Sequence, residues 1–483
     1  MGDIKDQTIK GVKWNAVGRI ANLAVTFLTG IVLARLLSPA DYGTVGMVSI
    51  FFVIAQTFVD SGFGLALIRK KEITEEDCST VFYFNIIIAA ICYLLLFLAA
   101  PYIAKFFNND ILTKVVRVSG LTLIIGAFSA VQFALLTRAV DFKTPSIINL
   151  IGYVISGVLG IGLAFYGYGV WALVFQSLFN TLVNSICVWF YSRWHPKLIF
   201  SKKSFHELFG FGSKILGSKL LDRFASNITT FAIGKYYTPT DLGYYTKANG
   251  TANLPSSFLS GIVGSVSMPV LSKFQDDNNV LINAYRKYIK TCSLIIFFLM
   301  FFLCAIAKPC ISFLYSDKWL PCVIYLQIFC LTKMFYHIHE ANCSLLLAKG
   351  RSDLHLKIEI IKKAIFFIVL IIALPISVLM LCISGLVTTH LSMLVNTYYT
   401  GKLLNYGYLQ QWKDFLPYLF WSLLACIPAY ALSFVNIPNW VNILLSSFIS
   451  FVLYFIILRW KKDECLKEVI QLSPLKKIIH LNY

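Results

Sequence analysis

Two ten-residue stretches decide the fold of this chain: Ala34-Arg35-Leu36-Leu37-Ser38-Pro39-Ala40-Asp41-Tyr42-Gly43 and Gly234-Lys235-Tyr236-Tyr237-Thr238-Pro239-Thr240-Asp241-Leu242-Gly243. They align without a gap at an offset of 200 residues. Each is typical of the end of one helix, a Ser/Thr-Pro-x-Asp-x-Gly turn and the start of the next helix. Proline fixes the turn and begins the new helix, and aspartate is suited to capping its free amide groups. The match therefore predicts that the chain consists of two sequence-related halves.

The polar residues around these turns repeat at the same offset. The matched sets are Arg19, Asn22, Thr26 and Thr29 with Lys219, Asp222, Ser226 and Thr229, followed by Ser49, Gln56 and Asp60 with Asn249, Ser256 and Ser260. At 100° per residue, each set from the first helix of a half falls within an arc of about 80°. Each of these helices is therefore predicted to carry one polar stripe.

The rest of the chain is too apolar for a soluble core. Of the 483 residues, 58% are hydrophobic and only 13% are charged. Apolar runs of about 20 residues, the length that crosses a bilayer, recur throughout. We predict an all-α, polytopic membrane protein with 14 transmembrane helices. The expected spans are 14–37, 43–68, 80–104, 118–137, 146–166, 170–191, 210–236, 243–271, 291–315, 321–347, 360–381, 383–401, 415–435 and 440–458.

Basic residues predict the orientation of these spans, because cytoplasmic connections are enriched in lysine and arginine. They concentrate in every second connection, where they include Arg69, Lys70, Lys71, Arg138, Lys143, Arg193, Lys197, Lys202, Lys203, Lys273, Arg286, Lys287, Lys290, Lys349, Arg351, Lys357, Lys402 and Lys413. Both termini are thus predicted to be cytoplasmic. Most of the net charge of +19 is explained by these connections, so it does not indicate a nucleic-acid partner.

The repeat also predicts the domain organisation. Residues 1–200 form one six-helix lobe, 201–405 form a second, and 406–483 supply two accessory helices and a cytoplasmic tail. Six is an even number, so both lobes insert with the same orientation and are related by a pseudo-two-fold axis along the membrane normal.

Several ionisable residues fall inside predicted spans, where each costs about 2.5 to 3.5 kcal/mol unless it faces protein or water. They are Arg19, Arg35, Asp60, Lys219, Asp222, Arg223, Lys235 and Lys247. Arg35 and Lys235 lie near helix ends and can snorkel, and Asp222 can form a structural ion pair with its neighbours. Arg19, Lys219 and Arg223 share a helical face with the other polar residues, which favours a water-filled cavity.

A cavity lined by these cations would suit an anionic substrate, because arginine offers forked donors to phosphate and pyrophosphate. The amides of Asn15, Asn22, Gln56, Asn249 and Asn253 are candidates for hydrogen bonds to sugar hydroxyls. Such amides also join membrane helices directly, so this second assignment stays open.

A second candidate group is Lys333, His337 and Glu340, which share one face of a later helix. His337 and Glu340 are suited to proton exchange in an ion-coupled transporter, and a helix-packing network is the alternative. The twelve scattered cysteines show no metal-ligand spacing, although Cys310 and Cys322 flank one short external loop and could pair. We find no phosphate-binding glycine loop, nucleophile elbow or metal motif, so we expect no enzyme activity, cofactor or metal.

The sequence as a whole resembles the bacterial polysaccharide (O-antigen) repeat-unit flippases. These form the oligosaccharide-lipid branch of a superfamily that also contains multidrug exporters and the lipid II flippase. The similarity rests on the turn motifs quoted above and on Gly11-Val12-Lys13-Trp14, Asp60-Ser61-Gly62-Phe63-Gly64, Leu135-Leu136-Thr137-Arg138 and Leu347-Ala348-Lys349-Gly350-Arg351. It covers most of the chain, and such motifs identify the superfamily better than the substrate.

The resemblance implies a transporter of the inner membrane that moves a polyprenyl-pyrophosphate-linked oligosaccharide between leaflets by alternating access. Its implied partners are that lipid-linked substrate, membrane lipids, a proton or sodium ion, and polysaccharide polymerase machinery. Two alternatives are a drug exporter of the same fold and a membrane-embedded glycan polymerase or ligase. The first would favour carboxylates over arginines in its cavity, and the second a sizeable external loop.

Overall fold

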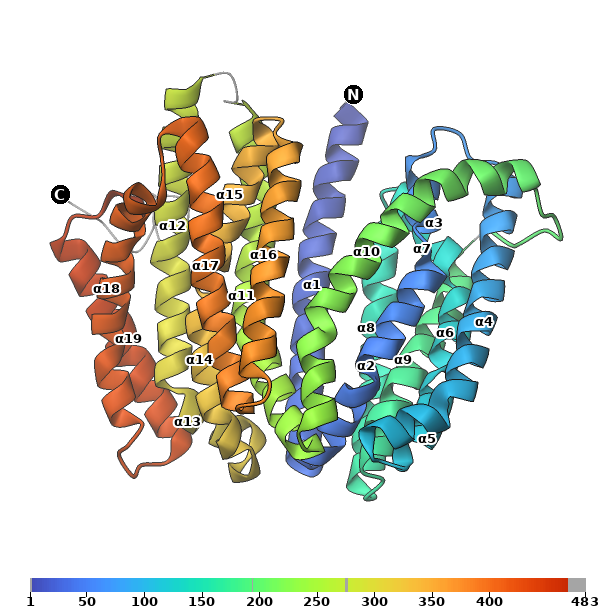
Figure 1. Ribbon diagram of the computed structural model, residues 1–483, viewed down its shortest axis with the longest axis horizontal. Coiled ribbons are helices and arrows are strands. Elements are labelled where there is room, and N and C mark those ends of the chain that lie inside the picture. Colours follow the sequence, from blue (N-terminus) through green and yellow to red (C-terminus); the bar gives the residue numbers. More distant parts are fainter. Residues whose placement is uncertain (1, 193, 274–276, 468–483) are drawn as a thin grey trace. The chain divides into compact units, whose positions relative to one another are not determined.

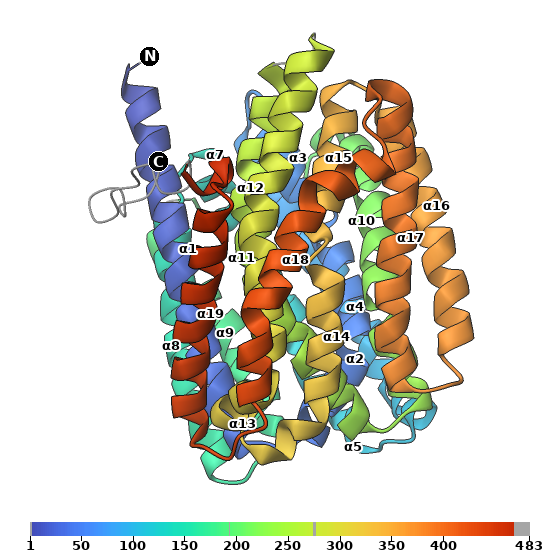
Figure 2. The same cartoon turned by 90° about the vertical axis from the view of Figure 1, so that its left-hand side faces the viewer.

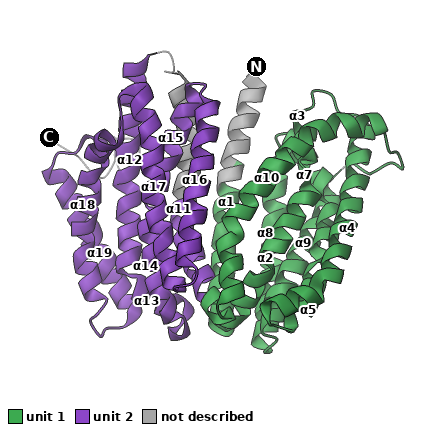
Figure 3. Cartoon of the chain, in the orientation of Figure 1, with its two compact units in different colours: residues 1–243 green, residues 244–483 purple. Residues whose placement is uncertain are grey.

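The computed structural model describes residues 2–192, 194–273 and 277–467, with the side chains of 2–13, 15, 16 and 257–273 left out. Every regular element in these ranges is a helix, as predicted (Figure 1). The chain divides into two compact units, residues 1–243 and 244–483 (Figure 3). Unit 1 contains α1 (Gly2–Leu36), α2 (Pro39–Asp60), α3 (Phe63–Arg69), α4 (Glu75–Phe107), α5 (Ile111–Ser119), α6 (Leu121–Ala127), α7 (Ala130–Arg138), α8 (Lys143–Phe165), α9 (Val170–Tyr191) and α10 (Lys202–Tyr236).

Helix α11 (Pro239–Lys273) begins in unit 1 and continues into unit 2. The remaining elements of unit 2 are α12 (Asn278–Ala305), α13 (Ala307–Tyr315), the 3-10 helix η1 (Asp317–Cys322), α14 (Val323–Lys333), α15 (Tyr336–Ala348), α16 (Ser352–Ala373), α17 (Val378–Leu404), α18 (Tyr408–Leu432) and α19 (Asn439–Trp460). In Figure 2 the long helices among them run roughly along one common direction.

The 200-residue offset is visible in the helices themselves. Helices α1 and α10 both have 35 residues, and their ends differ by 200 positions. The turns that follow are capped alike: Ser38 Oγ accepts from the Asp41 amide at 3.2 Å, and Thr238 Oγ1 accepts from the Asp241 amide at 3.1 Å. Each aspartate in turn accepts a hydrogen bond from the backbone amide of its Ser or Thr, which makes each turn a capping box.

The two turns also touch each other reciprocally within unit 1. A Cβ atom added to Gly43 would lie 1.7 Å from the carbonyl oxygen of Pro239, and one added to Gly243 would lie 1.9 Å from that of Pro39. Only glycine allows backbones to approach this closely. Because each turn offers the same glycine to the same proline of the other, the two turns form a pseudo-symmetric pair.

Close approach of backbones also organises the helices of unit 1. Helix α8 packs on both α1 and α9, and its small residues make that possible. Gly157 lies against Thr29 of α1, and Gly152 and Gly160 lie against Asn184 and Gln176 of α9. Small residues at such spacings are the usual means by which membrane helices approach.

Helix α10 packs on α2, α3 and α4, so it belongs structurally to unit 1. The segment before it is fastened to the start of α4: the amides of Lys197 and Ser201 donate to Ser79 Oγ at 3.1 Å and Thr80 Oγ1 at 2.9 Å. The division by packing therefore falls at residue 243, whereas the sequence repeat places its boundary at 200. The two boundaries differ because the repeat is defined by matching residues and the units by contacts between helices. The proposed lobe boundaries therefore remain a prediction.

In unit 2, the last two helices are tied to the others by polar contacts. Helix α18 packs on α12 and α19. Its Asp414 accepts two hydrogen bonds from Arg286 of α12, at 2.7 and 2.9 Å, and one from Tyr406 at 2.5 Å. Gln411 of α18 also exchanges hydrogen bonds of 3.0 Å with the buried Asn342 of α15. The helices of residues 406–460 are thus integral to unit 2.

Ten helical segments of the described residues are long and apolar enough to span a membrane. An eleventh is obtained if 111–127 and 130–138, bent by 42°, form one span. This establishes a multi-pass membrane protein. Two other predicted spans, 210–236 and 360–381, coincide with α10 and α16, which do not reach that threshold because they carry several charged residues in their apolar stretches. The last, 243–271, coincides with α11, and most of it lies outside the residues that were assessed as spans. The count of 14 therefore stays a prediction.

Two predicted spans are interrupted. The stretch 43–68 breaks after Asp60, where Ser61 and Gly62 adopt φ angles of 44° and 71° and α3 begins. Gly62 is needed there, because a Cβ atom would lie 2.6 Å from the carbonyl oxygen of Gly212 in α10. The stretch 118–137 is likewise divided among α5, α6 and α7. Hydropathy does not detect such breaks, since the residues on either side remain apolar.

Candidate functional site

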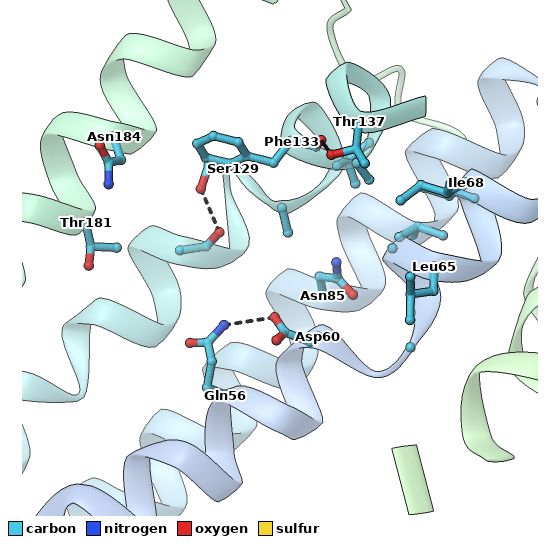
Figure 4. Close-up of a pocket in the computed structure, with 18 of the residues that line it drawn as sticks. Gln56, Asp60, Leu65, Ile68, Asn85, Ser129, Phe133, Thr137, Thr181 and Asn184 are labelled. Carbon is cyan, nitrogen blue, oxygen red and sulfur yellow. Dashed lines mark hydrogen bonds between the residues drawn. The ribbon is translucent and has the colours of Figure 1, made fainter. Parts of the chain in front are cut away.

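A polar cavity of about 560 Å³ lies within unit 1. It is lined by residues of α2, α3, α4, α6, α7, α9 and α10, several of which Figure 4 shows as sticks. Its polar lining residues are Gln56, Asp60, Asn85, Thr122, Ser129, Thr137, Ser177, Thr181, Asn184 and Lys219. These polar groups share the lining with apolar residues such as Leu65, Val81 and Phe133, so the cavity has a mixed surface.

Three of the residues predicted from the sequence meet in this cavity: Gln56, Asp60 and Lys219. Gln56 Nε2 donates to Asp60 Oδ1 at 3.0 Å, one helical turn away on α2 (Figure 4). The Asp60 carboxylate also feels the positive charges of Lys219 and Arg223 on α10. Lys219 lines the cavity, whereas Arg223 acts on the carboxylate from outside the lining. Two cations against one carboxylate leave a net positive charge near Asp60, which suits an anion.

Two amides at the cavity, whose side-chain oxygen atoms are buried, were not predicted as site residues. Asn85 of α4 is only 2% exposed, and Asn184 of α9 is half-buried. The side-chain carbonyl oxygens of both lack a hydrogen-bond partner among the described residues. Because buried polar atoms in proteins are nearly always satisfied, these two acceptors indicate water or a hydroxyl-bearing ligand in the cavity. Ser177, Thr181 and Asn184 recur at helical spacing within a predicted span, which is the signal that could have identified α9.

The other residues predicted in the first helices of the repeat do not line this cavity. Arg19, Asp222 and Arg223 are solvent-exposed in the structure, and Asn22 is half-buried with its side-chain oxygen unpartnered. The side chain of Asn15 lies outside the described residues. Lys235 donates to the carbonyl oxygen of Phe106 at 2.6 Å and stacks on the Phe106 ring, as expected for a cation near a helix end.

Unit 2 holds a separate pocket of about 490 Å³. Its lining residues are Asn253, Ser256, Tyr336, His339, Glu340, Cys343 and Lys362. Lys333 of α14 donates a hydrogen bond to Asn253, which gives this pocket a cation at its edge. Asn249, the repeat equivalent of Ser49, is half-buried and does not line it.

The two residues of the predicted pair, His337 and Glu340, have different surroundings in the structure. His337 is buried, its Nε2 lies 2.9 Å from Ser293 Oγ, and its ring packs edge-on against Phe297. Glu340 instead lines the pocket of unit 2 together with His339. His339 Nδ1 lies 2.9 Å from the amide nitrogen of Asn396 on α17. The histidine that lines the pocket with Glu340 is therefore His339.

The cysteines form no disulfide. All twelve are free thiols, and both Cys310 and Cys322 are buried. The alternative pairing of Cys310 with Cys322 is therefore absent from the structure.

Comparison with known proteins places the chain in a family. A family model described as "Polysaccharide biosynthesis protein" matches residues 32–324, which is more than half of the sequence. The chain belongs to this family. It is 28% identical to the teichuronic acid biosynthesis protein TuaB of Bacillus subtilis over 73% of this chain and 74% of that protein. It is 23% identical to the lipopolysaccharide biosynthesis protein WzxC of Escherichia coli over 76% and 75%.

Solved structures show the same fold. The lipid II flippase MurJ in an inward closed conformation matches with a TM-score of 0.78 and 17% identity, covering 93% of this chain and 99% of that one. An inward-facing multidrug resistance transporter of the MATE family matches with a TM-score of 0.56 and 15% identity, covering 92% and 96%. At these identities the likeness concerns the fold alone.

Proposed function

We propose that this protein flips polyprenyl-pyrophosphate-linked oligosaccharide repeat units across the bacterial inner membrane for surface polysaccharide synthesis. The observation that carries the proposal is the cavity of unit 1, where a lysine, a carboxylate and unsatisfied amides lie among membrane helices. Family membership and the names of the relatives, which concern polysaccharide biosynthesis, support the substrate class.

The proposed architecture has 14 transmembrane helices in two six-helix lobes with two accessory helices and cytoplasmic termini. It is supported by the matching helices and turns at an offset of 200 residues and by the lysine and arginine pattern. The lobes, residues 1–200 and 201–405, alternate in opening to the two sides of the membrane, as repeat-built transporters do.

The roles of individual residues follow from their chemistry. Lys219 and Arg223 attract the pyrophosphate, with Arg19 as a further cation on the same face of the first helix. Asp60 and Gln56 orient Lys219 and limit the net charge, so that the anion is held weakly enough to leave. The oxygens of Asn85 and Asn184 accept hydrogen bonds from sugar hydroxyls, while Asn22, Asp222 and Asn249 are second contacts along the path.

The driving ion, a proton or sodium, is assigned to the pocket of unit 2. His337 and Glu340 remain the proposed coupling residues. His337 contacts Ser293, whereas Glu340 lines the pocket together with His339. A polysaccharide polymerase is the proposed downstream partner, because flipped repeat units must be joined. The chain itself is proposed to carry out no covalent chemistry.

A multidrug exporter is the second candidate, because the MATE fold also matches. Its cargo is usually cationic and would be repelled by Lys219 and Arg223. Transport of an organic cation with no transport of lipid-linked oligosaccharide would favour that candidate over ours.

The test uses purified protein in liposomes that contain a fluorescent polyprenyl-pyrophosphate oligosaccharide. Flipping is measured as the fraction of substrate that becomes accessible to an added glycosidase. We expect Lys219→Gln to lower the flipping rate at least tenfold and Lys219→Arg to retain most of it, since only the second keeps the charge. Lys143→Gln is the control, because Lys143 stacks on Trp14 outside the cavity. Equal rates for wild type and Lys219→Gln would contradict the assignment.

A further inference from the structure

A second cluster of reactive side chains lies in unit 2, at the junction of α15 and α16. Cys343 of α15 and His355 and Glu359 of α16 each offer one ligand atom, and these atoms all lie within 4.8 Å of one another. His355 and Glu359 are four residues apart and so share one face of α16. All three side chains are half-buried.

From this arrangement we propose that Cys343, His355 and Glu359 form a site for a divalent transition metal of the zinc type. Thiolate, imidazole and carboxylate are the three side chains that zinc prefers, and three protein ligands leave a fourth position for water. A hard cation such as Mg²⁺ or Ca²⁺ would require oxygen ligands instead of sulfur.

The state of His355 is an independent indication of a ligand. Its Nδ1 atom is buried and has no hydrogen-bond partner among the residues that the structure describes. A buried ring nitrogen without a partner is uncommon, and metal coordination is one of the interactions that satisfies it.

Glu359 already has a partner that fits this role. Its carboxylate oxygen Oε1 accepts a hydrogen bond from Lys362 Nζ at 2.6 Å. The second carboxylate oxygen remains for the metal, and a hydrogen-bonded carboxylate is the usual form of such a ligand. Lys362 nevertheless competes electrostatically with a dication, which sets a moderate affinity.

The site lies beside the pocket of unit 2, because Cys343 and Lys362 also line that pocket. Binding joins α15 to α16 through the metal and adds positive charge next to Glu340. It also releases the thiol proton of Cys343 to solvent, since the thiolate is the ligand. Affinity therefore rises with pH until the thiol is fully ionised.

The test titrates the full chain, solubilised in detergent and stripped with a chelator, with Co²⁺ as a spectroscopic probe. We expect one Co²⁺ per chain, a thiolate-to-cobalt charge-transfer band, and displacement by Zn²⁺. Cys343→Ser should abolish the band. His355→Ala and Glu359→Gln should each weaken binding at least about tenfold, because even the loss of a residue that only hydrogen-bonds to a metal ligand weakens binding by that factor. Lys362→Gln should tighten binding, because it removes the competing charge.

Cys187→Ser is the matched control, since Cys187 is a half-buried thiol outside the cluster. A band that persists in Cys343→Ser, or weaker binding in Lys362→Gln, would overturn the proposal. A second measurement needs no variant: alkylation of Cys343, followed by peptide mass spectrometry, should slow when Zn²⁺ is present. An unchanged alkylation rate would also overturn it. Neither outcome bears on flipping, so the metal site and the proposed function are tested separately.

Discussion

Two buried asparagines, Asn342 and Asn85, differ in whether their side-chain amides are hydrogen-bonded. Asn342 in unit 2 is fully satisfied: its amide nitrogen donates to Gln411 and Ile338, and its oxygen accepts from Thr400 and Gln411. Asn85 in unit 1 is also buried, yet its side-chain oxygen has no partner in the described part of the chain and the residue lines the cavity. A satisfied amide stabilises the fold, whereas leaving a buried acceptor unsatisfied costs free energy; we therefore propose that Asn85 serves a ligand in the cavity.

This contrast gives a prediction for paired leucine substitutions. Asn85→Leu should leave stability unchanged or raise it slightly, because no hydrogen bond of the side-chain oxygen is lost, while flipping should fall at least tenfold. Asn342→Leu should destabilise by about 1–3 kcal/mol, because it leaves Gln411 and Thr400 without their partner. Thermal unfolding in detergent and the liposome assay measure the two effects. Equal destabilisation by both substitutions would contradict this interpretation.

At the scale of elements, ion pairs at the predicted cytoplasmic side connect three helices of unit 1. Lys70, just after α3, contacts Asp77 of α4 at 2.9 Å and Glu207 of α10 at 3.0 Å. Asp77 is 1% exposed and Glu207 is 55% exposed. Arg138 of α7 donates in addition to the carbonyl oxygens of Leu67 and Lys71 at 2.8 and 2.7 Å. These contacts hold the helices that border the cavity.

We predict unequal effects for the two partners of Lys70. Asp77→Asn should destabilise by about 3 kcal/mol, because it leaves a partly buried lysine without its buried counter-ion. Glu207→Gln should cost about 0–1 kcal/mol, since that partner is exposed and screened by water. Chemical unfolding of the detergent-solubilised protein measures both. A larger loss from Glu207→Gln than from Asp77→Asn would reverse the assignment.

The same pairs predict a pH dependence. Desolvation alone would lower the pKa of Lys70, but hydrogen bonds to Asp77 and Glu207 raise it above its ordinary value of 10.5. A raised lysine pKa contributes stability that is fully present below the unfolded-state pKa and is lost as the pH rises through the folded-state pKa. Stability should therefore decline above about pH 10.5, and Lys70→Met should show a shallower decline. Identical alkaline profiles would contradict this.

At the scale of the whole molecule, the two repeated turns contact each other reciprocally. Gly43 meets Pro239 and Gly243 meets Pro39, through turns that have the same capping box. In a pseudo-symmetric contact of this kind, equivalent residues have the same packing environment, so equivalent substitutions should have the same effect. The contact joins the start of α2 to the start of α11, which are the second helices of the two proposed lobes.

We therefore predict that Gly43→Val and Gly243→Val have similar effects. Each should destabilise the protein and abolish flipping, because the added side chain collides with the opposing proline backbone. Gly162→Ala is the control, since nothing lies within 4 Å of a Cβ atom there. Melting temperature and flipping rate measure the effect. Tolerance of one valine but not the other would mean that the contact is not symmetric.

The sequence by itself determined the all-helical membrane class, the family and the 200-residue repeat, because hydrophobic length and turn chemistry are local properties. It also predicted Gln56, Asp60 and Lys219, since polar residues at helical spacing stand out in an apolar span. Only the tertiary structure decided which helices enclose the cavity. Asn85, Asn184 and Ser129 come from segments that are distant in sequence, and a lone amide in an apolar run carries no signal of what it faces. For the same reason the sequence did not indicate that His339 lines a pocket together with Lys362, or that Cys343 lies near His355 and Glu359: packing between helices, not spacing along one helix, sets such neighbours.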